Sequence, residues 1–185
     1  PGLRGPLVVR RGDRLMAREH ARLMRSIWDD REFTALSPTE QGVYFGLCSS
    51  RDLSWCGVAP LLPKRLVRNS RGLTERKVSA ALDRLDRDRF IVIDSATDEL
   101  AIRTFIRHDE VMKQPNVVKA MGEAMKRVHS ERLYEVIVDE LGRDYYDHPN
   151  YSGWNTLRET FPKVWAQVEE MGSRNPSVNP SEMGS

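Results

Sequence analysis

Lysine and arginine side chains are concentrated in one short part of the chain, residues 63–89. This segment holds nine of them against four Asp and Glu, a net charge of +5, whereas the whole chain of 185 residues carries +2. Residues 1–30 carry +3, residues 31–62 carry −1 and residues 90–185 carry −5. Clustered cations attract nucleic-acid phosphates because they displace the counterions condensed on the backbone. The segment therefore predicts polyanion binding, and the alternative is a basic face that only meets water.

A helix-turn-helix is predicted within this basic segment. Pro63 begins a first short helix, a turn runs from Asn69 to Gly72, and Thr74 caps a second helix. In the second helix, apolar residues at i, i+3, i+4 and i+7 form one core face: Val78, Ala81, Leu82 and Leu85. At about 100° per residue, the opposite face carries Arg76, Ala80, Asp83 and Arg87.

The first turns of the second helix are expected to reach deepest into a DNA major groove. The candidates for reading bases there are Thr74, Arg76, Lys77 and Ala80. An arginine can bind both acceptors of a guanine edge, and the small Ala80 allows close approach or contact with a thymine methyl. The side chains placed to bind phosphates are Lys64, Arg65, Arg68 and Arg71, with Arg84 on the flank of the second helix. Acidic residues follow in the second helix and repel phosphate, so its C-terminal end is expected to leave the groove.

The flanking segments complete a winged helix. Ser37-Pro38-Thr39-Glu40 predicts a capped helix start, and the apolar stripe behind it ends near Ser50. A short extended piece follows at Gly57–Ala59. Strands at 90–94 and 100–105, joined by a polar turn, predict a β-hairpin as the wing, on which Arg103 is expected to hold the DNA backbone. The expected fold class is mainly α with a small β-hairpin (α+β), and residues 27–112 form the winged-helix domain.

Three further regions surround this domain. Residues 1–26 are expected to form an N-terminal arm with a loose helical pattern that begins at Leu15. Residues 113–142 predict a helical hairpin, which either adds to the core or forms the seam of a homodimer. Residues 143–185 predict a tyrosine-containing linker, one short amphipathic helix at 154–171 and a flexible tail of Asn, Pro and Ser repeats.

The sequence argues against catalysis, a cofactor and a metal site. It contains no GxxxxGKS/T, HExxH or GxSxG motif. Cys48, Cys56 and His108 lack the close ligand spacing of zinc sites, and two cysteines cannot form a disulfide framework. No run approaches the ~18 apolar residues of a membrane span, and no secretory leader opens the chain, so we expect a cytoplasmic protein without a membrane partner.

Residues 27–120 resemble a known family through an ordered set of segments. The segments are IWDDREFTALSPTEQGVYFGLCSSRDLSWCGVAP, PKRL, LDRLDRDRFIVID and FIRHDEVMKQPNVVKA. They are similar to the N-terminal winged-helix domain of phage and mobile-element replication-initiation (replisome-organiser) proteins, common in actinobacterial phages and genomes. Many members are described only as helix-turn-helix proteins. The resemblance implies double-stranded DNA as partner and a role in replication initiation.

The resemblance leaves two points open. Lys113-Gln114-Pro115-Asn116 matches a family motif, which is either a turn that caps the next helix or a nucleic-acid backbone contact by Lys113 and Gln114. The family's proteins often continue into a second domain that recruits the helicase or its loader. Here a linker, one helix and a repeat tail stand in that place, which favours a phage or prophage transcription regulator as an alternative.

Sequence-specific duplex binding, at an origin or an operator, is the leading hypothesis. The alternative from another class is a protein–protein adaptor, in which the winged helix binds a protein and the 154–171 helix docks in the groove of a replication or transcription protein.

Overall fold

The computed structural model describes residues 21–174, with the side chains placed as far as Met171. The predicted tail beyond residue 174 and most of the N-terminal arm lie outside the described residues. Within the described part, the loose helical pattern of the arm corresponds to one 3-10 turn, η1 (Arg25–Asp29).

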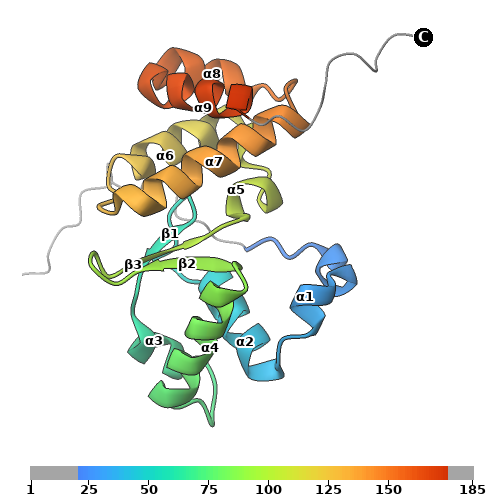
Figure 1. Ribbon diagram of the computed structural model, residues 1–185, viewed down its shortest axis with the longest axis vertical. Helices are drawn as coiled ribbons and strands as arrows, with labels where there is room; N and C mark the ends of the chain where they lie inside the picture. The colour runs from blue at the N-terminus through green and yellow to red at the C-terminus, as the bar shows by residue number, and fades with distance from the viewer. Residues whose placement is uncertain (1–20, 175–185) are drawn as a thin grey trace, which may run out of the picture.

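The described chain is mainly helical with one small antiparallel sheet (Figure 1), as the sequence predicted. The first half contains α1 (Arg31–Thr34), α2 (Pro38–Cys48), β1 (Val58–Pro60), α3 (Pro63–Val67), α4 (Glu75–Arg87), β2 (Ile91–Asp94) and β3 (Glu99–Ile102). The second half contains α5 (Phe105–His108), η2 (Val111–Lys113), α6 (Pro115–Met125), α7 (Glu131–Asp147), α8 (Gly153–Thr160) and α9 (Pro162–Arg174). The order α2, β1, α3, α4, β2, β3 is that of a winged helix.

Local capping determines where the main helices begin. At α2, Glu40 N donates to Ser37 Oγ (3.4 Å), and Ser37 N donates to the Glu40 carboxylate (2.6 Å), which completes the predicted capping box. Thr74 Oγ1 accepts from Lys77 N at 3.3 Å and starts α4. The four predicted core residues of α4 are all buried: Val78, Ala81, Leu82 and Leu85.

The sheet has the strand order β1-β3-β2, so β3 is the middle strand. Val58 of β1 pairs with Ala101, and Ile91 of β2 pairs with Ile102. Figure 1 shows α2, α3 and α4 on one side of this sheet and α5 to α9 on the other. One continuous hydrophobic cluster extends through both layers, from Phe33 to Val168.

The predicted second strand, 100–105, is wrong at its end. The strand stops at Ile102, and Phe105 begins α5. Phe105 is buried against Gly57, where a Cβ atom would lie 2.8 Å from the Phe105 Cβ. Alternation in the sequence suggested a longer strand, but the close approach of Phe105 to the backbone at Gly57 bends the chain away from the sheet.

The predicted linker and single amphipathic helix in 143–171 are also wrong. Helix α7 continues to Asp147, and the segment 154–171 forms two helices rather than one. The break falls at Phe161-Pro162, where Phe161 is non-helical (φ −130°, ψ 61°) because a residue before proline is disfavoured in the α region. Tyr145 lies 5.1 Å, centroid to centroid, from both Trp154 and Trp165. Helices α6 to α9 therefore form a four-helix unit in place of a hairpin and a linker.

Two glycines with positive φ allow a test of the Gly57–Phe105 contact. Gly57→Ala is expected to lower the free energy of unfolding by about 1–3 kcal/mol more than Gly72→Ala, since overpacking adds to the backbone strain at Gly57. Both glycines have left-handed backbones (φ 82° and 87°), but at Gly72 no atom of the described residues beyond its chain neighbours lies within 4 Å of a Cβ. Urea titrations of both variants would measure the difference, and equal losses would contradict a steric role for Phe105.

Candidate nucleic-acid interface

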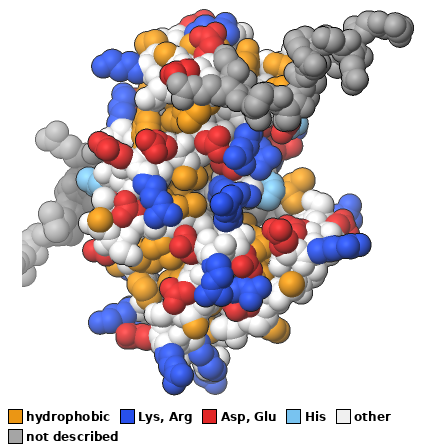
Figure 2. Space-filling model, in the orientation of Figure 1, with side chains coloured by type: hydrophobic (Ala, Val, Ile, Leu, Met, Phe, Trp, Pro, Cys, Tyr) orange, Lys and Arg blue, Asp and Glu red, His pale blue; other side chains and the backbone are white. Residues whose placement is uncertain are grey.

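One end of the molecule carries a basic surface formed by α3, the following turn and the first turns of α4. Residues 63–80 contain six Lys and Arg and one acid, Glu75. All six cations are exposed: Lys64, Arg65, Arg68, Arg71, Arg76 and Lys77. We call these six residues the α3–α4 surface. Figure 2 shows Lys and Arg side chains at the end of the molecule where Figure 1 places α3 and the start of α4.

Most of these cations pair with no carboxylate of the described residues. Arg65 pairs with Asp52, and Lys77 Nζ donates to the Gly72 carbonyl at 2.9 Å. Within residues 21–174, the other four make no ion pair with a carboxylate: Lys64, Arg68, Arg71 and Arg76. Exposed cations without a carboxylate partner can bind a polyanion without first breaking a salt bridge.

The outer face of α4 agrees with the sequence prediction. Arg76 and Ala80 are exposed opposite the buried core face of the helix. The Thr74 hydroxyl accepts the backbone hydrogen bond that caps α4, so it is already engaged within the helix. Arg76 and Ala80 are the better placed of the predicted base-reading residues.

The C-terminal end of α4 makes structural contacts instead. Arg84 Nε lies 2.6 Å from the Asp88 carboxylate, and Asp86 Oδ1 accepts from Ile93 N at 2.9 Å. Residues 81–89 hold three acids and three arginines and add no net charge. The positive field of α4 therefore comes from its N-terminal half.

The wing is attached to the four-helix unit. The hairpin turn at 95–98 contains no Lys or Arg. Asp94 accepts from the Ser130 hydroxyl at 2.5 Å, and Glu99 accepts from Ser130 N at 2.9 Å and His129 N at 3.1 Å. These two carboxylates tie the hairpin to the loop between α6 and α7, and we call this contact the wing latch.

The latch shifts the titration of both carboxylates. The hydrogen bond from Ser130 and that from Ala96 N hold the pKa of Asp94 below its ordinary value. Burial alone would raise the pKa of Glu99, but hydrogen bonds from Ser130 and His129 outweigh it and lower the pKa. Both groups are therefore ionised, and the latch intact, at neutral pH.

Arg103 does not lie on the wing as predicted. It follows β3, and its Nε lies 3.7 Å from the buried Glu140 of α7. Arg107 Nε and Arg143 Nη1 also approach Glu140, at 3.1 Å and 3.3 Å. Burial raises the pKa of Glu140, and the three arginines oppose that rise. The expected wing contact by Arg103 fails because a carboxylate 37 residues further along the chain attracts its side chain toward α7.

Lys113 is likewise separate from the α3–α4 surface. It ends η2 just before α6, in the opposite layer of the molecule (Figure 1). Its Nζ lies 2.5 Å from Glu110 and 5.3 Å from the Tyr151 ring centroid. Gln114 is the N-cap residue of α6 but makes no side-chain capping bond.

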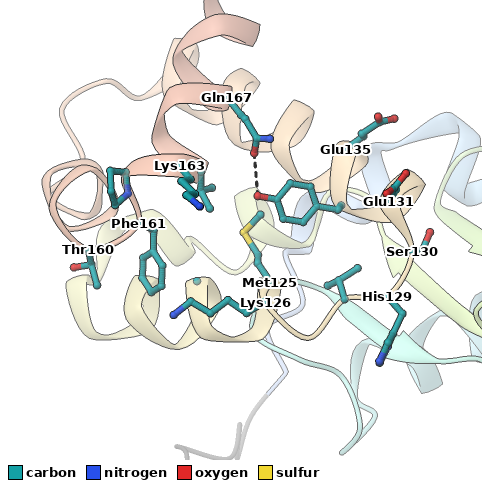
Figure 3. Close-up of a pocket in the computed structure, with 15 residues that line it drawn as sticks. Met125, Lys126, His129, Ser130, Glu131, Glu135, Thr160, Phe161, Lys163 and Gln167 are labelled. Carbon is teal, nitrogen blue, oxygen red and sulfur yellow. Dashed lines mark hydrogen bonds between the residues drawn. The ribbon is translucent and has the colours of Figure 1, made fainter.

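An apolar pocket of about 700 Å³ opens between α6, the start of α7 and the start of α9. Met125, Tyr134 and Phe161 line the pocket. The Tyr134 hydroxyl donates to Gln167 at 2.9 Å, which is the bond drawn dashed in Figure 3. Lys126 and Lys163 lie on one side of the pocket, and Glu131 and Glu135 on another. The apolar face of α9 is buried in the fold, at Trp165 and Val168. The apolar face of α9 is therefore not available to dock on a partner. The pocket beside it is still an open apolar surface.

The described residues offer no metal site and no membrane span. Across 21–174, no three His, Cys, Asp or Glu side chains come together as ligands for a metal ion. Over the same range, every helix is too short or too polar to cross a membrane.

The first half of the chain has the element order of a winged helix, and a four-helix extension follows it. No protein-family model matches the chain, and neither a curated protein nor a solved structure matches it significantly. The function must therefore be inferred from the site itself.

The wing latch predicts a pH-dependent effect of Ser130→Ala. At pH 7 the variant should lose about 1–2 kcal/mol of unfolding free energy with the α7 cap, and the Asp94 bond in addition. Because the folded pKa of Asp94 lies below its ordinary 3.8, that second contribution is present above 3.8 and is lost as the pH falls through the folded value. Urea titrations from about pH 7 to about pH 3 should show the deficit shrinking on the acid side.

Thr74→Ala is the matched control. It removes an N-cap whose hydroxyl bonds to a backbone N–H and to no carboxylate of the described residues, so its deficit should stay constant over the same range. A Ser130→Ala deficit that is equally constant would refute the coupling between Ser130 and Asp94.

Proposed function

We propose that this protein binds double-stranded DNA through the α3–α4 surface and performs no catalysis. The observation that carries the proposal is the exposed cationic end of the helix-turn-helix, where five of six cations lack a carboxylate partner within the described residues. An α-helix fits the major groove, and helix-turn-helix proteins place the second helix of the pair there.

Each part of the surface has a distinct task in this proposal. Arg76 and Ala80 face the base edges from the first turns of α4. Lys64, Arg68 and Arg71 bind the phosphates beside the groove, which sets the register of the protein on DNA. The Lys77 ammonium donates to the Gly72 carbonyl and adds positive charge beside Arg76, which favours the approach of DNA. Residues 81–89 carry no net charge, so that end of α4 is not assigned a base-reading task.

The wing has a structural task in the same proposal. Asp94 and Glu99 are hydrogen-bonded to the α6–α7 loop, and the hairpin turn carries no Lys or Arg. The turn therefore has no side chain that could form an ion pair with a phosphate. Sequence preference then depends on α4 alone. A role in phage or mobile-element replication initiation follows from the family resemblance, and transcription regulation with the same DNA-binding head is the alternative biological setting.

A protein-interaction role is the second candidate, and the open apolar pocket beside α9 is the observation that favours it. Apolar docking of a protein partner responds weakly to salt, whereas binding through several phosphates weakens steeply. A salt titration therefore separates the two candidates.

The DNA-binding proposal predicts a strong effect of Arg76→Ala combined with Lys77→Ala. The double variant should bind random-sequence duplex DNA about 10-fold or more weakly, because it removes two cations of the α3–α4 surface and binding to mixed sequence depends on neutralised phosphates. The slope of log K against log salt should become less steep by about one for each phosphate that the variant no longer neutralises. Fluorescence anisotropy with labelled random-sequence duplex, at several salt concentrations, would measure both quantities.

Lys119→Ala combined with Arg127→Ala is the matched control. Both residues are exposed in the other layer of the molecule, and the variant loses the same two charges. Circular dichroism would verify that both variants fold. Equal losses in the two variants, or no binding of the parent protein at low salt, would overturn the proposal and favour the protein-interaction role.

A further inference from the structure

Arginines also line a surface depression between α1 and the C-terminal end of α4, about 630 Å³ in volume. Of its eight lining residues, two are acidic and five are arginines: Arg31, Arg84, Arg87, Arg89 and Arg103. We call it the arginine depression. Figure 2 shows Lys and Arg side chains, with Asp and Glu among them, over the region where Figure 1 places the end of α4.

Packing fixes the two walls of this depression. Asp30 caps α1 by accepting from Glu32 N at 2.8 Å, which positions Arg31 at the first helical residue. Phe33 of α1 is fully buried and contacts Phe90, the residue after Arg89, with ring centroids 6.0 Å apart. Arg31 of α1 and the arginines at the end of α4 therefore line the depression from well-packed supports.

Arg89 occupies a backbone position that favours glycine. Phe90 N donates to Leu85 O (2.9 Å) and Arg89 N donates to Asp86 O (3.1 Å), which is the Schellman arrangement at the end of α4. Arg89 has φ 60°, in the left-handed region that is costly for a side chain with a Cβ. The exposed Arg89 side chain makes no ion pair within residues 21–174 that would offset this strain. Strained backbone of this kind is concentrated at binding sites.

The charges in the depression are incompletely balanced. Arg84 pairs with Asp88, and Arg103 lies toward Glu140. In the part of the chain that the structure describes, Arg31, Arg87 and Arg89 pair with no carboxylate. The backbone hydrogen bonds of Arg89 and Phe90 already satisfy carbonyls at the end of α4. The arginine side chains are therefore not required as hydrogen-bond donors to those carbonyls. Guanidinium groups in a shared hollow match the geometry of phosphate oxygens.

We propose that the arginine depression is a second phosphate-binding site, which holds the backbone of the same DNA whose groove is read by the N-terminal half of α4. This inference rests on the proposed DNA binding. Arg76 and Arg87 are 11 residues apart on one face of α4, a rise of about 16 Å, which is comparable with the ~12 Å width of the major groove. Phosphate binding at the depression adds affinity and salt dependence without adding sequence preference.

The test uses Arg89→Gly, Arg87→Ala and the double variant in the full chain. Arg89→Gly removes a charge and relieves the left-handed strain, so its Tm should equal or exceed that of the parent protein. The double variant should bind a labelled duplex about 5-fold to 10-fold more weakly, with a salt slope less steep by about 0.9 for each phosphate that it no longer binds. Lys119→Ala combined with Arg127→Ala again matches the loss of two charges. Inorganic tripolyphosphate, followed by its effect on the Tm of each variant, probes the depression without DNA.

The outcomes separate this inference from the proposed function. If the Arg76/Lys77 variant loses DNA affinity while the Arg87/Arg89 variant binds as tightly as the charge-matched control and responds equally to tripolyphosphate, the second site is refuted and DNA binding stands. If the protein binds no duplex but tripolyphosphate raises the Tm only when Arg87 and Arg89 are present, the depression is a phosphate site for small ligands and the proposed function fails. Loss of both responses in the double variant, with the control unaffected, supports the polynucleotide site.

Discussion

The pairing and burial of strand β3 hold the two layers of this molecule together. β3 bonds to β1 along one edge and to β2 along the other, so that neither edge is left open. Its residues Leu100, Ala101 and Ile102 are buried, between the helix-turn-helix on one side and the α5–α7 region on the other. Any change that displaces β3 would therefore disturb the packing of both α4 and α7 against the sheet.

The polar contacts around β3 explain how the charges of the chain are distributed. Glu99 and Asp94 are used by the wing latch, and Glu140 is surrounded by three arginines. Acidic residues in the second half of the chain thus serve partly to join the layers. The cations of the α3–α4 surface lie at the far end of the first layer, where few acids reach them. This separation leaves a positive field on a protein whose net charge is only +2.

Sequence reasoning succeeds where the signals are local. Ser37 and Thr74 start helices through bonds three residues away, and the spacing of Val78 to Leu85 defines a buried face from one helix alone. These features were enough to predict the helix-turn-helix, its hairpin and the exposed cations on its outer face.

It fails where the decisive partner is distant along the chain. Phe105 continues an alternating pattern, yet it packs against Gly57 and begins α5. Tyr145 lies in a polar stretch typical of a linker, but two tryptophans from α8 and α9 enclose it. Arg103 was expected at DNA because its partner, Glu140, has no local signature. The arginine depression was missed for the same reason, since α1 and the end of α4 meet through the contact of Phe33 with Phe90.

The continuous hydrophobic cluster from Phe33 to Val168 crosses the domain boundary that the sequence predicted. The expected boundary at residue 112 marks a change of architecture, but Ile106, Val111 and Met112 on its near side are buried against the four-helix unit, with the Met112 carbonyl directly beside Gly153. A fragment cut there would expose these apolar side chains to water and leave the carboxylates of the hairpin without their donors. We therefore expect the winged helix and its extension to unfold as one cooperative unit, and proteolysis between them to cause aggregation rather than two stable halves.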